Sequence, residues 1–295
     1  MPSSPDTSVV VPVGSVDDHL HQQLLALQSQ VGADSYEVVL SLNNPDVTLE
    51  ERLTAMVAGL ADDRFRIVDS SDQRGASHAR NAGAAAAMAD RLAFCDADDI
   101  VEPDWLARIT DALSRFDAVG GHLEEEQLVP VGQRRWRPPA TPGRLPEFQG
   151  YPYIVSANMA IGRTAFAEVG GFDESLSRCE DIAISLVLRD KGRSIGFAED
   201  AVVHYRHRGG LRSLVRQHYL YGRGMSEVLV RVGLPGTHQG TTGSSSAQHR
   251  RAASGLAMLK ANVSPGQRFS PIVILRRGST LSGRIVALVA ERRAR

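Results

Sequence analysis

Three carboxylates stand within four residues at Asp96, Asp98 and Asp99, directly after the short apolar run 91–95. Such a run is typical of a strand buried on both faces, and ligands of open α/β sheets bind beyond the carboxyl ends of the strands. Carboxylates this close together repel one another unless a cation lies between them. Magnesium-type ions take oxygen ligands, usually one or two carboxylates together with substrate phosphates. We therefore interpret Asp96 and Asp98 as part of a metal–phosphate site.

This acidic cluster has two other interpretations. A dense acidic turn is often solvated surface or a helix cap, but here an apolar strand directs the cluster to the edge of the sheet. A calcium loop of the EF-hand type is excluded by spacing. The sixth position from Asp96 is Val101 instead of Gly, and the twelfth is Ala107 instead of Glu.

Other charged residues are candidates for a site. Arg80 lies near the start of an alanine-rich helix and is placed to meet an anionic group, with a structural salt bridge as the alternative. Glu180 and Asp181 open a predicted helix, where the helix dipole alone would favour acids. His204 and His207 do not make a convincing zinc pair, because no cysteine or further ligand accompanies them.

Strand and helix patterns alternate along the first 230 residues. Asp17 or Asp18 is positioned to cap the first helix, and Thr48, with Glu51 at capping-box spacing, the second. This alternation predicts βαβ units and a largely parallel sheet of the α/β class. The Pro- and Gly-rich segment 117–153 shows little pattern and is interpreted as a loop or flap. The predicted strands cover 8–13, 36–42, 65–68, 91–95, 154–161 and 201–204, and the predicted helices include 103–116, 182–189 and 211–231.

The composition is that of an ordinary globular protein. The chain has 295 residues, 42% hydrophobic and 23% charged, which suits one large α/β domain or one domain with an appendage. Two cysteines, Cys95 and Cys179, cannot build a disulfide framework, so a reducing cytosol is the simpler expectation. The N-terminus shows no signal-peptide pattern, and no stretch of about 18 apolar residues occurs. We expect a cytoplasmic protein, soluble or peripheral at the cytoplasmic membrane face.

The charge is unevenly distributed, although the formal net charge is −1. Residues 250–295 hold ten Lys or Arg and a single acid, Glu291. A Gly/Ser/Thr-rich segment, 233–250, predicts a flexible linker before a basic amphipathic tail over 251–295. The tail suits an anionic membrane surface, and packing on the main domain or on a partner is an equal alternative. Nucleic acid is not an expected partner, because Phe269 is the only aromatic residue of the tail.

The motifs in this order resemble the family 2 inverting glycosyltransferases with the GT-A fold. The likeness covers about residues 8–225, and the spaced motifs together are more specific than any one of them. It implies a GT-A domain over 1–232, with a Rossmann-like sheet, a nucleotide-binding half over 1–116, an acceptor half over 117–232 and a helical C-terminal extension. The motifs are Val11-Pro12-Val13, Gly75 through Gly83, Phe94 through Asp99, Ser156-Ala157-Asn158, Gly170 through Glu174, Glu180-Asp181 and Val203-His204.

The resemblance implies an inverting, hexosyltransferase-type enzyme. An acceptor hydroxyl would attack the anomeric carbon of a nucleoside-diphosphate sugar, in the synthesis of a cell-envelope or polysaccharide glycan with a glycan or lipid-linked acceptor. Asp98, with Asp96 and His204, would hold Mn²⁺ or Mg²⁺ on the diphosphate, and Asp181 matches the catalytic base. The implied substrate-binding residues are Pro12, Val13, Asn43, Arg80, Asp96, Asn158, Gly171, Glu180, Arg206 and Arg208.

The sequence departs from the family pattern in the nucleotide pocket. Gly14-Ser15 follows the first strand where the family often has an aromatic-Asn pair, and Asn43-Asn44 stands where an Asp usually contacts the base. A UDP-sugar is favoured as the donor, and dTDP- and GDP-sugars are alternatives because an amide changes the hydrogen-bond polarity. Two other functions stay open. One is a non-catalytic nucleotide- or carbohydrate-binding protein on the same fold, and the other is a phosphohydrolase or nucleotidyltransferase that uses the same carboxylates.

Overall fold

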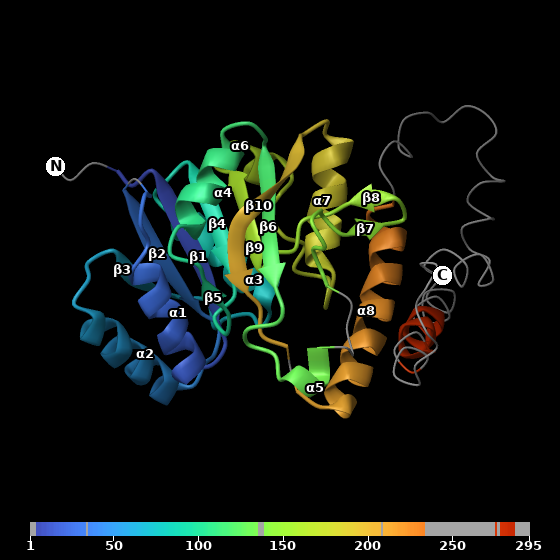
Figure 1. The fold of residues 1–295 in the computed structure, drawn as a ribbon, viewed down its shortest axis with the longest axis horizontal. Coiled ribbons are helices and arrows are strands. Elements are labelled where there is room, and N and C mark those ends of the chain that lie inside the picture. Colours follow the sequence, from blue (N-terminus) through green and yellow to red (C-terminus); the bar gives the residue numbers. More distant parts are fainter. Residues whose placement is uncertain are drawn as a thin grey trace.

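The computed structural model describes residues 4–33, 35–134, 139–207, 209–233, 275 and 278–286. An eight-stranded sheet has the strand order β3-β2-β1-β4-β9-β6-β10-β5 (Figure 1). Neighbouring strands are parallel, except that β9 pairs antiparallel with β4 and β6 and β5 pairs antiparallel with β10. The mostly parallel sheet predicted from the sequence is confirmed. The strands are β1 (Thr7–Val13), β2 (Tyr36–Leu42), β3 (Phe65–Asp69), β4 (Arg91–Cys95), β5 (Ile100–Val101), β6 (Ala118–Glu124), β9 (Asn158–Gly162) and β10 (Ile195–His204), with a separate pair β7 (Glu147–Phe148) and β8 (Tyr151–Pro152).

Helices cover both faces of the sheet because side chains alternate along each strand. On β1, Val9, Val11 and Val13 pack against α1, α2 and α4, whereas Val10 faces the side that carries α3, α6 and α7. All four valines are fully buried. The helices are α1 (Asp18–Gln28), α2 (Val47–Leu60), α3 (Ala76–Ala86), α4 (Trp105–Leu113), α5 (Val131–Arg134), α6 (Arg163–Glu168), α7 (Glu180–Asp190) and α8 (Leu211–Arg231).

The long helix α8 packs on α7 at the side of the domain away from the N-terminus (Figure 1). Ile182 and Leu186 of α7 are buried in one apolar cluster with Val228 of α8. Residues 278–286 are helical, and they approach α8 closely. The predicted linker beyond residue 233 and the rest of the predicted basic tail lie outside the described residues. Within the described ranges, no helix combines the length and apolar character needed to cross a bilayer.

The structure corrects several predicted boundaries. Asp46 caps α2 instead of Thr48, whose backbone N donates to Asp46 Oδ1 over 3.0 Å. The strand predicted from residue 154 begins only at Asn158, because the N of Ile154 is held by Ser185 Oγ of α7 (3.0 Å). The segment 117–153, interpreted as a loop, contains β6. Two glycines obscure the strand pattern there, and Gly121 is needed because a Cβ would lie 2.3 Å from the carbonyl oxygen of Ala201.

Candidate active site

The acidic cluster follows β4, as the sequence predicts. Oxygen atoms of Asp96, Asp98 and Asp99 all lie within 4.8 Å of one another, with Asp98 exposed and Asp99 buried. Burial raises the pKa of Asp99 well above its ordinary value, and the charges of Asp96 and Asp98 add to this effect. Oδ2 of Asp99 is buried without a hydrogen-bond partner. A set of closely spaced oxygen donors with one unsatisfied carboxylate oxygen fits a hard divalent cation.

Arg80 joins this cluster to α7. Its guanidinium is buried, and Nη2 donates to Asp96 Oδ1 over 2.6 Å while Nη1 donates to Glu180 Oε1 over 3.0 Å. Burial opposes the charge, but the two carboxylates outweigh it, so the pKa of Arg80 is raised. The salt bridge that the sequence left as an alternative is therefore present. It also places Arg80 inside the site, where its buried Nε has no partner among the described residues.

Asp181 lies beside Glu180 in the first turn of α7. The helix starts after Cys179, which takes the left-handed conformation with φ 66°, and the N of Ile182 donates to Asp181 Oδ1 (2.8 Å). Burial, followed by the charge of Glu180, raises the pKa of Asp181 to about 7. A carboxylate with a pKa near neutrality is suited to accept a proton as a general base.

A cavity of about 380 Å³ brings six of the predicted site residues together. One side is acidic and is formed by the end of β4 and the start of α7. The facing side is formed by α8, from Ser213 to Met225. The predicted site residues that line it are Arg80, Asp96, Asp98, Glu180, Asp181 and Arg206.

Arg206 lies across the acidic cluster from Arg80. Its backbone N donates to Asp99 Oδ1 over 2.7 Å, and its Nε donates to the carbonyl oxygen of Asp98 over 2.8 Å. These contacts hold a guanidinium next to the carboxylates, and a guanidinium can pair with phosphate oxygens. Arg208, predicted to act with it, lies outside the described residues.

His204 pairs with Ile100, next to Asp99, but it is not part of the group of possible metal ligands at Asp96, Asp98 and Asp99. Its Nε2 lies 2.6 Å from Glu102 Oε1 and its Nδ1 lies 2.8 Å from Glu124 Oε2, and the residue is buried. Both ring nitrogens are thus engaged by carboxylates that were not part of the predicted site. Metal ligation by His204 would require one of these contacts to break. The structure places His204 in an ion-pair network at the end of β10.

Other predicted substrate-binding residues hold the framework. Asn158 is buried: its Oδ1 accepts from Trp105 Nε1 (2.8 Å), and its Nδ2 donates to the carbonyl oxygens of His122 and Ala201 (2.9 Å each). Val13 is fully buried and Pro12 partly so. None of these three lines the cavity. Asn158 joins α4, β6 and β10 through its bonds, and the substrate-binding role of the three residues stays a prediction.

Gly171 also lies outside the cavity. Its φ is +72°, and a Cβ there would lie 2.7 Å from Oδ1 of Asn81. That same oxygen accepts from the N of Phe172 over 2.9 Å, and Nδ2 donates to the carbonyl oxygen of Phe172 over 2.8 Å. The glycine is required so that Asn81 of α3 can hold the turn before α7.

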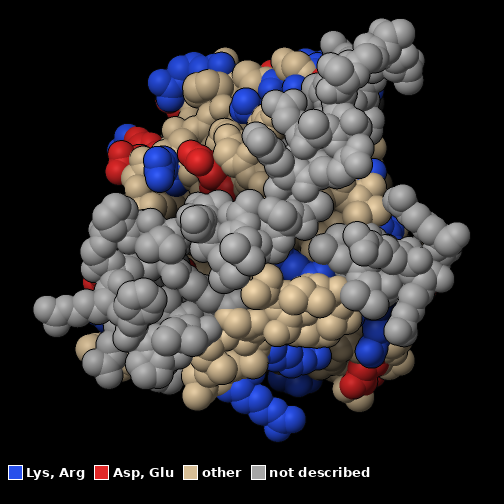
Figure 2. All heavy atoms as spheres, turned by 90° about the vertical axis from the view of Figure 1, so that its right-hand side faces the viewer, with Lys and Arg blue, Asp and Glu red and all other residues tan. Residues whose placement is uncertain are grey.

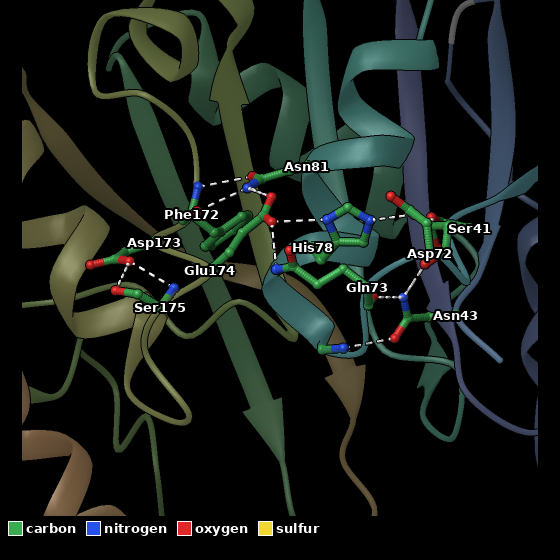
Figure 3. A network of polar contacts seen from close by, with 12 residues as sticks. Ser41, Asn43, Asp72, Gln73, His78, Asn81, Phe172, Asp173, Glu174 and Ser175 are labelled. Atoms are coloured by element: carbon green, nitrogen blue, oxygen red, sulfur yellow. Dashed lines mark hydrogen bonds and ion pairs between the residues drawn. The ribbon is translucent and has the colours of Figure 1, made fainter. Parts of the chain in front are cut away.

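Asn43 holds the loop that leads into α3 (Figure 3). Its Oδ1 accepts from the N of Gly75 over 2.8 Å, and its Nδ2 donates to the carbonyl oxygens of Ser70 and Gln73. The amide was predicted to read the nucleotide base. In the structure, this amide instead forms hydrogen bonds with backbone groups between residues 70 and 75.

A second polar group in Figure 3 ties this loop to the turn before α7. His78 lies between two carboxylates, with Nε2 2.9 Å from Asp72 Oδ1 and Nδ1 2.9 Å from Glu174 Oε2. Asp72 and then Glu174 raise the pKa of His78. Glu174 also accepts from Asn81 Nδ2 and Gln73 Nε2. No role was predicted for these residues, although His78 and Asn81 lie within the motif Gly75 through Gly83 and Glu174 ends the motif Gly170 through Glu174.

Three tyrosines of the cavity were also missed. Tyr153, Tyr205 and Tyr221 line it, and Gln217 Nε2 donates to the hydroxyl of Tyr221 over 2.8 Å. They come from three separate segments, so no local spacing could have indicated them. Their rings and hydroxyls suit the binding of a sugar.

The sheet order, the acidic cluster after β4 and the acidic start of α7 define a GT-A glycosyltransferase fold. The family model described as glycosyl transferase family 2 matches residues 8–170, and the chain belongs to this family.

Curated relatives cover part of the chain. The pre-mycofactocin glycosyltransferase of Mycobacterium tuberculosis is 25% identical over 183 residues, which are 57% of this chain and 37% of the relative. The succinoglycan biosynthesis protein ExoO of Rhizobium meliloti is 30% identical over 159 residues, 52% of this chain and 43% of the relative. The chain therefore spans less than half the length of these relatives.

Solved structures share the fold at low sequence identity. One is the mannosyltransferase PcManGT from Pyrobaculum calidifontis, in complex with GDP-Man and Mn²⁺, with a TM-score of 0.65 and 16% sequence identity. The superposition covers 97% of this chain and 88% of the PcManGT chain. Another is TarS 1–349 of S. aureus, in complex with UDP-GlcNAc, with a TM-score of 0.54 and 15% sequence identity. This superposition covers 78% of this chain and 68% of the TarS chain. Both similarities support the GT-A fold.

Proposed function

We propose that this protein is a metal-dependent, inverting glycosyltransferase of the hexosyltransferase type. It moves a sugar from a nucleoside-diphosphate sugar to an acceptor hydroxyl in the synthesis of a cell-envelope or polysaccharide glycan. The observation that carries the proposal is the double contact of Arg80 with Asp96 and Glu180. It fixes the acidic cluster next to Asp181 in one cavity, so a site for the leaving diphosphate and a site for the base are adjacent.

The acidic cluster is the place for the donor. Asp98 and Asp96 would hold Mn²⁺ or Mg²⁺, and the ion supplies compensation for the negative charge of the leaving diphosphate. Arg206 lies beside Asp98 and can donate to a phosphate oxygen. PcManGT is complexed with GDP-Man and Mn²⁺, and TarS with UDP-GlcNAc, which supports a nucleotide sugar as the donor class. UDP, dTDP and GDP are all candidates for the carrier.

Asp181 is the base in this proposal. With a pKa near 7 it is partly ionised at neutral pH and can take the proton of an acceptor hydroxyl. The acceptor would enter from the α8 side of the cavity and attack the anomeric carbon from the face opposite to the diphosphate. Such a direct displacement inverts the configuration of the sugar.

The substitution Asp181→Asn tests the proposal. We expect release of nucleoside diphosphate from a panel of UDP-, dTDP- and GDP-sugars to fall by about 10²–10⁴-fold, since this is the usual contribution of a general base. Binding of the nucleotide with Mn²⁺ should be retained. Asp111→Asn, at an exposed position of α4, is the control. Turnover of Asp181→Asn at the wild-type rate would reject the role of Asp181, and no turnover by the wild type would favour a non-catalytic binding protein.

A further inference from the structure

The helix over 278–286 interlocks with α8 through two glycines. A Cβ on Gly222 would lie 2.0 Å from the carbonyl oxygen of Thr280, and a Cβ on Gly283 would lie 2.0 Å from the carbonyl oxygen of Tyr219. Each glycine thus lets the backbone of the other helix approach. Any other residue at either position would push the helices apart. The C-terminal helix is therefore fitted to this face of α8.

The opposite face of α8 meets the loop that carries the start of α7. A Cβ on Gly224 would lie 2.7 Å from the carbonyl oxygen of Arg178. Gly222 and Gly224 point to opposite sides of the helix, because two residues span about 200°. The helix α8 is consequently held between the C-terminal helix and the loop before Asp181. This packing brings a residue of the C-terminal helix to the edge of the cavity.

That residue is Arg284. Its Nη2 lies 3.0 Å from Sδ of Met225, a residue that lines the cavity. Burial lowers the pKa of Arg284, and Cys179, also at the cavity, is the group that opposes this effect. Among the described residues no carboxylate forms an ion pair with it. A thioether cannot balance a guanidinium charge, and a partly buried cation without a counter-ion is unfavourable.

Two further arginines line the cavity, Arg178 in the loop before α7 and Arg216 in α8. Arg178 and Arg216 have no ion-pair partner within the described part of the chain, and the only acid of α8, Glu227, pairs with Arg223 at 3.4 Å. Figure 2 shows the side of the molecule where α8 and the C-terminal helix lie, and Lys and Arg side chains are spread over its described surface. Arginines thus line the cavity at α8 and at the loop before α7, whereas carboxylates line it at the end of β4 and the start of α7.

We propose that Arg284, together with Arg178 and Arg216, binds an anionic group of the acceptor, a phosphate or a carboxylate close to the hydroxyl that is glycosylated. The inference rests on the proposed function, because it assigns the α8 side of the cavity to the acceptor. The acidic side takes the metal and the diphosphate of the donor. The C-terminal helix then supplies a specificity-determining residue to a site that the first 232 residues form only in part.

Binding of methyl phosphate in the presence of chelator tests the proposal, since the chelator removes metal-dependent binding at the acidic cluster. We expect the wild type to bind methyl phosphate, and Arg284→Met and Arg216→Ala each to weaken binding by about 10- to 100-fold, the usual range for a charged hydrogen bond. Arg284→Met keeps an unbranched apolar stem beside Met225 and removes the charge. Arg212→Ala, one turn from Arg216 and outside the cavity, is the matched control and should bind as the wild type does.

Unchanged binding by both Arg284→Met and Arg216→Ala would overturn the proposal. Loss of binding only in Arg206→Ala would do the same, because it would place the anion on the donor side. Arg216 is exposed, so its variant reports on the site even where Arg284→Met disturbs the helix contact. Nucleotide binding with Mn²⁺ should be unaffected in both variants. A wild type that binds methyl phosphate but no nucleotide would reject the proposed function and leave the anion site standing.

A second experiment shows whether the anionic group belongs to a lipid-linked or to a water-soluble acceptor. Vesicles of phosphatidic acid and of phosphatidylcholine are sedimented with the wild type and with Arg284→Met. Arginine-dependent sedimentation with phosphatidic acid would assign the anion to a lipid-linked acceptor. Loss of methyl phosphate binding without any change in sedimentation would assign it to a water-soluble, phosphorylated or acidic glycan.

Discussion

The guanidinium of Arg80 lies 2.6 Å from the carboxylate of Asp96, and this ion pair is the link between the two halves of the site. Arg80 belongs to α3 and Asp96 follows β4, so the pair also joins a helix to the end of the central sheet. The second contact of Arg80, to Glu180, extends the link to the helix that carries Asp181. The spacing between the acidic cluster and Asp181 therefore depends on one buried side chain.

Replacing Arg80 by Met should destabilise the protein markedly. The side chain of Arg80 is 4% exposed, whereas those of Asp96 and Glu180 are 28% and 16% exposed. Loss of the cation leaves two carboxylates near each other without a partner. We expect the free energy of unfolding in urea to fall by about 3 kcal/mol, the lower end of the range for a broken buried ion pair.

Arg115→Ala is the control for this change, because Arg115 forms an exposed pair with Asp111. It should cost about 0–0.5 kcal/mol. Similar losses in the two variants would show that Arg80 has no special structural role.

The pH dependence of stability should reveal the buried carboxyl of Asp181. Its pKa in the folded protein is about 7, above the ordinary value of 3.8, so between these pH values the folded state keeps a proton that the unfolded state has released. Asp181 therefore makes the protein less stable as pH rises from about 4 to about 7. The stability advantage of Asp181→Asn over the wild type should grow by roughly 1.4 kcal/mol per pH unit across that window and then level off.

Denaturation in guanidinium chloride at pH 5, 6, 7 and 8 measures this difference. Parallel pH profiles for wild type and Asp181→Asn would contradict a raised pKa. The rate of sugar transfer should show the matching profile, rising about tenfold per pH unit below pH 7 and flattening above it.

The contacts of His78 predict a dependence of the same sign, in a higher pH window. Asp72 and Glu174 raise its pKa above the ordinary 6.5, so its ion pairs stabilise the folded state fully below pH 6.5. This contribution is lost as pH rises through the pKa of the folded state. The melting temperature of His78→Gln should therefore lie below that of the wild type at pH 6 and approach it at pH 9. His21→Gln, at an exposed position of α1, is the control substitution.

Substitutions at two adjacent glycines distinguish the free-energy cost of backbone strain from the cost of a lost side-chain contact. Gly170 and Gly171 have φ of +77° and +72°, but a Cβ on Gly170 would meet no atom within 4 Å, whereas one on Gly171 would meet Asn81. Gly170→Ala should cost about 1 kcal/mol of unfolding free energy from strain alone. Gly171→Ala should cost about 2–3 kcal/mol, since Asn81 must also release the turn at Phe172. Equal losses in urea denaturation would show that the contact of Asn81 is unimportant.

Part of the candidate site could be predicted because its residues lie in local patterns. An apolar strand followed by three carboxylates locates the cluster at Asp96, and two acids at the start of a helix locate Asp181. Such signals need only neighbouring residues. The fold class followed in the same way from alternating strands and helices, although β6 was missed because glycines replace the side chains of the strand pattern.

The partners of a side chain could not be predicted where they come from distant segments. His204 meets Glu102 and Glu124, which are 102 and 80 residues away in sequence. Asn43 was expected at the nucleotide, but it binds a loop about 30 residues further on. The contact of the C-terminal helix with Gly222 depends on how α8 packs, which no local pattern records.

Thermal unfolding with UDP, dTDP and GDP, each with Mn²⁺ and with chelator, tests the central claim most directly. We predict that one nucleotide raises the melting temperature in the presence of metal, corresponding to about 2.7 kcal/mol at a concentration 100-fold above its dissociation constant. Asp98→Asn should abolish the shift and Asp111→Asn should keep it. The absence of a shift with all three nucleotides, or an undiminished shift in Asp98→Asn, would contradict a metal-dependent donor site at the end of β4.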